Sequence, residues 1–346
     1  MRPDAVIGWD LGGAHLKAAR VDRDGVVHAV AQVACPLWQG LHHLEAAMAA
    51  TRAVVGEAAR HAVTMTGEMT DLFPGRREGV VTLAGAMHGL LPAAGLRFFA
   101  DDLRFVGLEE VPVHAEAIAS ANWLATAAVV ARRLPAALLV DIGSTTTDLV
   151  PVAGGAVRTA GAGDYHRLVS GELVYTGVVR TPLMALGDAV TVGADRVPLM
   201  AEYFATTADV YRVTGELPGQ ADLHPAADGG AKDVAQSARR IGRMIGCDLE
   251  AVSTREWLGI AGEFRRLQVG RLAAACARQL AQGRLPADAP LVGAGVGRFL
   301  VPELARRSGR PALDFASLFP EASAEPGRLA DCAPAVAVAV LALDES

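Results

Sequence analysis

The chain of 346 residues is long enough for about two domains. Its 51% hydrophobic and 20% charged residues exclude a disordered protein, and a net charge of −6 without a basic stripe argues against a nucleic-acid partner. The longest apolar run, at 333–343, is shorter than the roughly 18 residues that suggest a membrane span, and the N-terminus lacks an apolar secretory segment. Four cysteines without a CxxC pair fit reduced thiols, so we expect a cytoplasmic protein with no membrane partner.

The first part of the chain is predicted to form a meander and a helix. An apolar run ends at Asp10, the Gly12-Gly13 pair indicates a turn, and Asp24-Gly25 is a strong hairpin signal. Apolar residues then recur at helical spacing. The predicted elements are strands over 5–9, 15–21 and 26–33, and a helix over 41–62.

A similar pattern returns after a predicted helix over 113–133. Asp141 follows Asp10 by 131 positions, and Gly143 keeps the same offset from Gly12. Around these residues we predict strands over 137–140, 145–152 and 156–159, because β-branched and apolar residues crowd them. Two copies of one strand-turn-strand unit indicate an internal repeat, with a boundary near Pro135 that divides the chain into domains 1–134 and 135–346.

The rest of the chain is mostly helical. A surface loop is expected over 218–230, helices over 231–246, 256–283 and 297–307, and a short strand at 290–294. The apolar segment 333–343 favours a closing helix, although its alternation of alanine and valine also fits a strand. The second domain therefore carries a helical insert.

Two acidic turns carry the chemistry of the predicted site. Asp10 and Asp141 each end a strand beside a tight turn, formed by Gly12-Gly13 in the first copy and by Gly143 and the residues after it in the second. Turn amides that point the same way bind anions, and glycine allows a phosphate to approach the backbone. A carboxylate at such a turn can hold Mg²⁺, usually through water, and the metal bridges to phosphate oxygens. The pair therefore predicts a phosphate site.

The order of these motifs resembles the actin, sugar-kinase and Hsp70 ATPase superfamily. The resemblance rests on Asp10-x-Gly12-Gly13, on the run from Asp141 to Asp148 and on Gly293-x-Gly295, and it spans nearly the whole chain. It implies an α/β fold of two ribonuclease-H-like domains with a nucleotide in the central cleft. It further implies that the two acidic turns are phosphate loops and that the Gly293 turn lies on the adenosine side. In ATP-using relatives the late loop often carries a longer glycine run, so ATP stays an alternative occupant.

Four longer stretches, at 64–71, 141–148, 175–182 and 206–211, resemble one family. That family is the hydantoinase/oxoprolinase-like proteins of tetrahydromethanopterin-linked one-carbon metabolism. Its archaeal relatives are methanofuran-biosynthesis synthases, and methylotrophic bacteria carry related proteins for a methylofuran-type cofactor. The resemblance implies a transferase that condenses an (aminomethyl)furanmethanol diphosphate with γ-glutamyltyramine, forming an aryl ether and releasing diphosphate.

The resemblance implies a catalytic, a phosphate-binding and a metal-binding group of residues. A cleft that holds Mg-triphosphate also suits Mg-diphosphate as a leaving group, and the reaction needs positioning, charge neutralisation and a base for the phenol. The catalytic candidates are Glu68, Asp71, Arg180 and Asp209. The candidates for phosphate are Gly12, Gly13, Lys17, Gly143, Ser144, Thr145, Thr146, Gly293 and Gly295. The candidates for Mg²⁺ are Asp10, Asp141 and Asp148.

Several of these residues have a second interpretation. Glu68 and Asp71, three apart, would share a helix face and serve in proton transfer or in gripping an amine, or they could simply begin a helix. The fork of Arg180 suits diphosphate or a glutamyl carboxylate, and a structural ion pair is nearly as good an interpretation. Asp209 and Tyr211 could line the substrate side. Histidines such as His15 show no metal-ligand spacing and are interpreted as ordinary packing or surface residues.

Two other functions stay open on the sequence alone. One is an ATP-dependent small-molecule kinase or a hydantoinase/oxoprolinase-type enzyme of the same fold. The other is a nucleotide-binding regulator or assembly partner, which the absence of a basic or hydrophobic tail disfavours. The expected partners are a phosphate-ester substrate and a phenol or amine co-substrate, and we allow for a homodimer.

Overall fold

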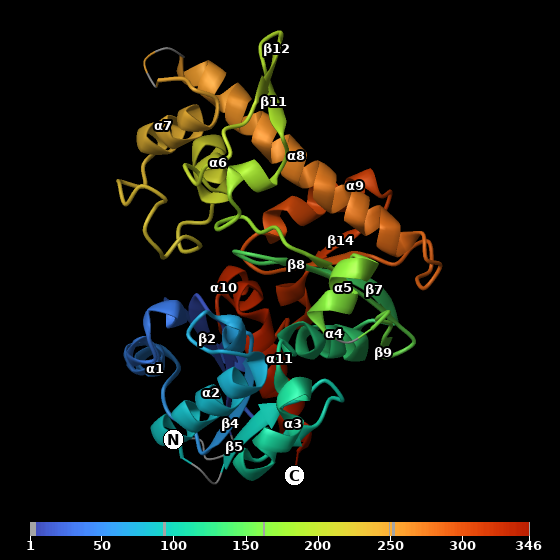
Figure 1. The fold of residues 1–346 in the computed structure, drawn as a ribbon. Helices are drawn as coiled ribbons and strands as arrows, with labels where there is room; N and C mark the ends of the chain where they lie inside the picture. The colour runs from blue at the N-terminus through green and yellow to red at the C-terminus, as the bar shows by residue number, and fades with distance from the viewer. Residues whose placement is uncertain (1–4, 93–94, 162, 249, 251–252, 346) are drawn as a thin grey trace.

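The computed structural model describes residues 5–92, 95–161, 163–248, 250 and 253–345. Two mixed sheets lie one above the other in Figure 1, and a mostly helical region continues beyond the second sheet. Each sheet begins with an antiparallel hairpin, continues with parallel strands, and is built from one half of the predicted repeat. The predicted α/β organisation is therefore present.

The first sheet has the strand order β3-β2-β1-β4-β5-β6. Strands β1 (Val6–Leu11), β2 (His15–Val21) and β3 (Val27–Ala34) form the predicted meander, and Gly25 closes its hairpin at φ +81°. Strand β4 (Arg60–Met65) joins β1 in parallel, followed by β5 (Leu96–Phe99) and the short antiparallel β6 (Phe105–Val106). Every residue of β1 is buried, because layers pack on both faces of this central strand.

Helices of the first half differ from prediction at two points. The predicted helix over 41–62 is α1 (His42–Val55), which ends at Gly56 with φ +74°, and β4 follows. The predicted helix over 113–133 is two helices, α3 (Val111–Ile118) and α4 (Asn122–Arg133). Ser120 between them has φ +52°, a left-handed conformation that no α-helix can contain. Helix α2 (Arg76–Leu90) lies between β4 and β5 in the chain.

The second sheet has the order β10-β8-β7-β13-β14, with β9 beside β8. Its strands are β7 (Ala136–Ile142), β8 (Thr147–Ala153), β9 (Ala156–Val157), β10 (Leu173–Val174), β13 (Leu291–Ala294) and β14 (Ala312–Asp314). The β7–β8 register repeats that of β1–β2, because Asp141 faces Asp148 just as Asp10 faces Lys17. Strand β13 then runs parallel to β7 as β4 does to β1.

A mostly helical region lies beyond the second sheet, and it contains the helices predicted over 231–246 and 256–283. Three of its helices, α6, α7 and the long α8, gather at the top of Figure 1 with the hairpin β11–β12. The bounds are α5 (Asp164–Ser170), β11 (Ala189–Val192), β12 (Asp195–Pro198), α6 (Thr207–Thr214), α7 (Val234–Met244), α8 (Thr254–Leu280) and α9 (Val301–Arg307). Within the described ranges, none of the helices has both the length and the apolar character that crossing a bilayer requires.

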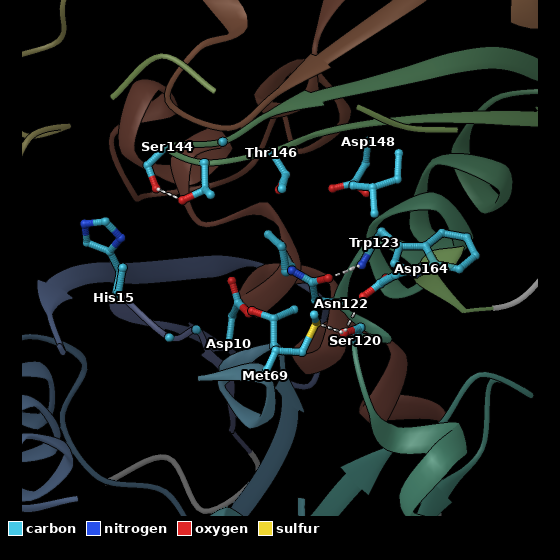
Figure 2. Close-up of a pocket in the computed structure, with 18 of the residues that line it drawn as sticks. Asp10, His15, Met69, Ser120, Asn122, Trp123, Ser144, Thr146, Asp148 and Asp164 are labelled. Carbon is cyan, nitrogen blue, oxygen red and sulfur yellow. Dashed lines mark hydrogen bonds between the residues drawn. The ribbon is translucent and has the colours of Figure 1, made fainter. Parts of the chain in front are cut away.

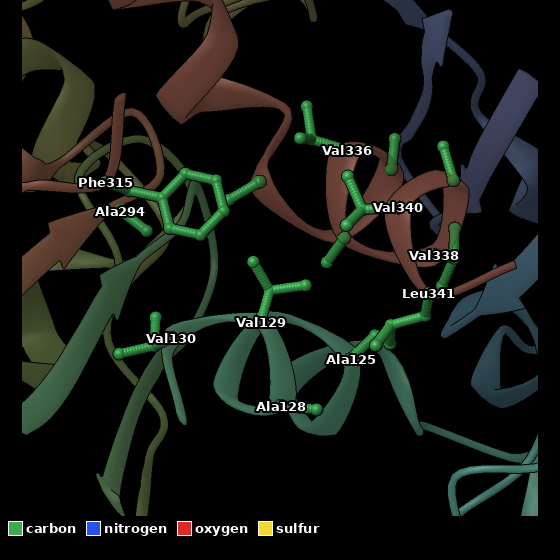
Figure 3. Packing of buried hydrophobic residues seen from close by; sticks show 14 of the residues in the cluster. Ala125, Ala128, Val129, Val130, Ala294, Phe315, Val336, Val338, Val340 and Leu341 are labelled. Atoms are coloured by element: carbon green, nitrogen blue, oxygen red, sulfur yellow. The ribbon is translucent and has the colours of Figure 1, made fainter. Parts of the chain in front are cut away.

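The chain closes with two helices, α10 (Pro326–Asp331) and α11 (Ala333–Leu341), and the helix interpretation of 333–343 is confirmed. All nine residues of α11 are buried. Figure 3 shows helix α11 above helix α4, and Val129 of α4 shares one core cluster with Val336 and Val340 of α11. Helix α11 also packs on β1 and β2, so the C-terminus returns to the first sheet. The division at 134/135 stays a prediction.

Gly8 of β1 makes the closest approach to α11. A β-carbon at Gly8 would lie 2.0 Å from the carbonyl oxygen of Ala335 and 2.8 Å from the backbone nitrogen of Ala339. We expect Gly8→Ala to lower the free energy of unfolding by roughly 3 kcal/mol, because backbone atoms on both sides must move apart. Urea denaturation measures this change.

The control is Gly85→Ala in α2, where an added β-carbon meets nothing within 4 Å. Alanine at an open helical position is expected to raise stability by about 0.5–1 kcal/mol. Equal stability of the Gly8 variant and the wild-type protein would contradict the packing of α11 on β1.

Candidate active site between the two sheets

A cleft of about 600 Å³ lies between the sheets and receives the ends of β1 and β7. Figure 2 shows Asp10 on one wall and Ser144 and Thr146 on the other. Most of the predicted site residues line it. They are Asp10, Gly12, Gly13, Lys17, Asp71, Asp141, Gly143, Ser144, Thr145, Thr146, Asp148 and Arg180.

The two acidic turns have the same backbone geometry. The Gly12 amide donates to the His15 carbonyl at 3.0 Å, and the Gly143 amide donates to the Thr146 carbonyl at 2.8 Å. A β-carbon on Gly12 would lie 2.9 Å from the His15 carbonyl oxygen, and one on Gly13 would lie 2.8 Å from the Thr70 side chain. Gly12 and Gly13 therefore have no room for a side chain, and these two glycines and Gly143 line the cleft, where the lack of a side chain allows a phosphate to approach closely.

Asp10 and Lys17 form a buried pair beside the first turn. Lys17 Nζ lies 3.9 Å from Asp10 Oδ2, and their side chains are only 17% and 6% exposed. Burial raises the pKa of Asp10, whereas Lys17 opposes the rise. Burial lowers the pKa of Lys17, but the surrounding carboxylates, Asp10 first, raise it above its usual value. Lys17 is therefore a permanent positive charge in the cleft.

Asp141 on the second turn is more strongly perturbed. Burial, with Asp148 and Asp10 nearby, raises the pKa of Asp141 to about 7 against the opposing charge of Lys17. Asp148 itself binds the buried guanidinium of Arg167 at 2.6 Å. The cleft thus concentrates negative charge that its own cations do not fully neutralise.

The predicted adenosine-side glycines lie outside the cleft lining. A β-carbon on Gly295, which has φ +75°, would lie 2.4 Å from Asp141 Oδ1, and one on Gly293 would lie 3.2 Å from the Val301 side chain. The described contacts therefore place Gly295 directly behind the carboxyl group of Asp141. Gly293 packs against the turn and helix that follow it, and adenosine binding here stays a prediction.

The donor set fits a hard divalent cation. No group of three or more histidine, cysteine or acidic side chains in the described part of the chain is close enough to hold a metal by itself. Mg²⁺, however, usually takes one or two carboxylates and completes its shell with water and phosphate oxygens. Asp10 Oδ1 is buried and has no hydrogen-bond partner among the described residues. This orphaned oxygen, with Asp141 on the facing turn, suits such a site.

Glu68 lies just behind the cleft wall. It is fully buried in the single 3-10 turn Gly67–Met69, and the hydroxyl of Ser120 donates to its Oε1 at 2.7 Å. Because α2 begins only at Arg76, Glu68 and Asp71 do not share a helix face, contrary to prediction. Glu68 points inward to Ser120, and Asp71 lines the cleft.

Burial raises the pKa of Glu68 from 4.5 to about 7. The native state therefore holds a proton that the unfolded chain releases near pH 4.5, so stability falls as the pH rises through this window. The total loss is roughly 3 kcal/mol. We expect Glu68→Gln, which cannot ionise and keeps the acceptor for Ser120, to remove the part of this fall that Glu68 contributes, while Asp141, whose pKa burial also raises to about 7, keeps its own part.

Urea denaturation near pH 5 and near pH 8 measures the effect, and the exposed Glu256→Gln is the control. A loss of stability between the two pH values that is as large in the Glu68 variant as in the wild-type protein would contradict this prediction.

Ser120 links Glu68 to the opposite side of the cleft. Its hydroxyl lies 3.4 Å from Asp164 Oδ2 at the start of α5, and Asp164 in turn pairs with Arg76 at the start of α2. Figure 2 shows Ser120 and Asp164 side by side. Sequence analysis missed this cluster, since the helical pattern across 113–133 conceals the break at Ser120.

Arg180 lies at another part of the cleft. Its backbone amide donates to the Ser144 carbonyl at 2.8 Å, and its guanidinium carbon is 5.0 Å from the centre of a Trp38 ring. His15 also lines the cleft, and burial, reinforced by His224 and nearby cations, lowers its pKa well below 6.5. His15 is therefore a buried histidine with a neutral ring and not a surface residue.

Asp209 and Tyr211 are buried inside the protein and are not among the residues that line the cleft. Asp209 closes the capping box of α6 and binds the buried Arg240 at 2.8 Å. The hydroxyl of Tyr211 donates to Gln268 at 2.6 Å inside the protein. The described contacts give both side chains structural partners, and a substrate role for them gains no support from this geometry.

Comparison with known proteins places this cleft in context. The chain is 28% identical over 260 residues to (4-{4-[2-(gamma-L-glutamylamino)ethyl]phenoxymethyl}furan-2-yl)methanamine synthase of Methanocaldococcus jannaschii, covering 75% of this chain and 77% of that protein. It is 33% identical over 132 residues to the synthase of the same name from Methanococcus vannielii, covering 38% of this chain and 59% of that one.

The fold is also found among solved structures. A nucleotide-free acetone carboxylase matches with a TM-score of 0.56 and 13% identity, over 87% of this chain and 66% of that one. The predicted α/β fold with a central cleft is confirmed, since two mixed sheets lie on either side of that cleft. The family model for hydantoinase/oxoprolinase matches residues 59–340, which include the second acidic turn and most of the cleft. This chain belongs to the hydantoinase/oxoprolinase family.

Proposed function

We propose that this protein is a transferase of methanofuran- or methylofuran-type cofactor biosynthesis. It would couple an (aminomethyl)furanmethanol diphosphate to the phenol of a γ-glutamyltyramine-like acceptor. The similarity to the M. jannaschii synthase over three quarters of both chains carries this proposal. The name of that relative describes a product with a furan methanamine, a phenoxymethyl ether and a glutamylamino tail, which are the parts that such a coupling joins.

The reaction balances without an oxidant or a second cofactor. The phenol oxygen forms a bond to the CH₂ carbon on the furan ring, and the bond from that carbon to the diphosphate oxygen breaks with its electron pair. The phenol proton is released, and diphosphate leaves. Because the furan ring disperses positive charge at the reacting carbon, the transition state can be loose, and the protein must mainly position the reactants and neutralise the leaving group.

The two acidic turns supply the diphosphate site in this proposal. The amides around Gly12 and Gly143 face the phosphates, and Lys17 neutralises part of their charge. Asp10 and Asp141 would hold Mg²⁺, which supplies stabilisation of the charge that develops on the leaving diphosphate. Asp71 is exposed in the cleft and forms no ion pair with the described residues, so it suits the primary ammonium of the furan substrate.

The test is direct coupling by the purified protein. A furanmethyl diphosphate with an aminomethyl group, γ-glutamyltyramine and Mg²⁺ should give the mass of the aryl ether and one equivalent of diphosphate. Parallel incubation with ATP and Mg²⁺ examines the kinase alternative. Steady ATP hydrolysis together with no coupled product would overturn the transferase proposal.

A further inference from the structure

The two ends of the cleft carry different side chains. Figure 2 shows Asp148 and Asp164 at one end, with His15 and Ser144 at the other. Arg180 belongs to the second end, because its amide is bound to the Ser144 carbonyl. Asp148 and Asp164 are already paired with Arg167 and Arg76, so their charge is largely compensated within the protein, whereas the charge of Arg180 is not.

Arg180 has an uncompensated positive charge. The side chain is exposed, lines the cleft and forms no ion pair with any described residue. The described arginines nearest to it in the chain, Arg167 and Arg196, are both paired with aspartates. Stacking over Trp38 holds the guanidinium in place while leaving its hydrogen-bond donors free. Such a group is prepared to receive an anion from outside the protein.

Trp38, which stacks with Arg180, lies at one end of a row of aromatic rings. The Trp38 ring is 38% exposed, and its centre lies 5.2 Å from that of His224, which is 4.9 Å from His15. His224 Nε2 donates to the Ala14 carbonyl at 2.8 Å, whereas the buried Nε2 of His15 has no partner among the described residues. We call Trp38, Arg180, His15 and His224 the Trp38 cluster. It joins residues of both halves of the chain beside the first phosphate turn.

We propose that the Trp38 cluster is the acceptor subsite, where the phenol ring packs on Trp38 and the carboxylate of the acceptor's tail pairs with Arg180. This inference rests on the proposed transferase function. Lys17 already supplies a buried cation beside both acidic turns, so the diphosphate has its own counter-charge there. The ammonium of the furan substrate is then left to Asp71, which lines the cleft and forms no ion pair among the described residues.

The experiment compares two acceptors, γ-glutamyltyramine and N-acetyltyramine, which keeps the phenol but lacks the carboxylate. Arg180→Gln should raise the KM for γ-glutamyltyramine about 10- to 100-fold and leave the KM for N-acetyltyramine and for the diphosphate substrate unchanged. Arg180→Lys should recover part of the loss. Trp38→Leu should raise the KM for both acceptors. The control is Arg196→Gln, an exposed arginine on the β11–β12 hairpin.

Calorimetry of γ-glutamyltyramine with the protein and no diphosphate substrate gives a readout independent of turnover. Binding that Arg180→Gln removes supports the subsite. If Arg180→Gln raised the KM for the diphosphate substrate, or raised the KM for both acceptors equally, Arg180 would have another role and the proposed subsite would be overturned. Absence of coupling by the wild-type protein would overturn the proposed function instead, and absence of binding by the wild-type protein would overturn the subsite.

Discussion

Asp141→Asn is expected to lower the turnover number of the coupling reaction roughly a hundred- to a thousandfold. This is the usual cost of removing one group that stabilises the charge developing in a transition state. The change keeps the shape of the side chain and removes only its negative charge. Because burial already raises the pKa of Asp141 to about 7, the folded protein should be as stable as the wild type or more so. Initial rates over a range of Mg²⁺ concentrations and a thermal melt measure the two effects.

Asp10→Asn should lower the turnover number to the same extent, but, unlike Asp141→Asn, it should also lower the stability of the folded protein. Lys17 Nζ lies 3.9 Å from Asp10, so this variant leaves a buried ammonium without its nearest carboxylate. The exposed Asp188→Asn serves as the control for both variants. Full turnover in both the Asp10 and the Asp141 variant, with the fold intact, would remove their assignment as metal acids.

Asp209→Asn is expected to lower the free energy of unfolding by roughly 3 kcal/mol, because it leaves the fully buried Arg240 without one of its two carboxylates. The amide also weakens the capping box of α6. Turnover measured well below the melting temperature should stay within about threefold of the wild type, since Asp209 lies outside the cleft lining. Urea denaturation and initial rates together separate a structural from a catalytic role.

The matched control is Asp188→Asn, whose carboxylate binds Arg196 at 3.0 Å with both side chains exposed. An exposed pair of this kind should contribute less than about 1 kcal/mol. A large loss of turnover in the Asp209 variant without loss of stability would restore the catalytic interpretation made from its sequence context.

The acidic turns show how far local sequence reasoning reaches. A strand that ends in an acid beside glycine is a property of a few consecutive residues, and the repeat of that pattern specifies two equivalent hairpins. Asp10 and Asp141 were therefore predicted to lie at one site, and the structure places both in the cleft. The helices of the insert follow from apolar periodicity in the same way, with shifts of a few residues at their ends.

The surroundings of the turns depend on contacts between distant segments. Ser120 meets Glu68 across 52 positions, and neither residue carries a local signal for that contact. The helical pattern around Ser120 even conceals that Ser120 itself has a left-handed backbone conformation, which turns its side chain toward the cleft wall. Asp209 presents the opposite case, because a motif that resembles a substrate segment folds into a capping box with a buried arginine partner.

Consecutive residues are enough to predict the paired strand-turn-strand units, the acids and glycines of both turns and the family resemblance. Which charges are compensated follows instead from contacts between distant segments of the folded chain. Burial raises the pKa of Asp141 and of Glu68, and the neighbours that cover these acids come from distant segments: Gly295 lies against Asp141, and Ser120 and Gly79 lie against Glu68. The free cation of Arg180 on Trp38 likewise exists only because the two halves of the chain meet there.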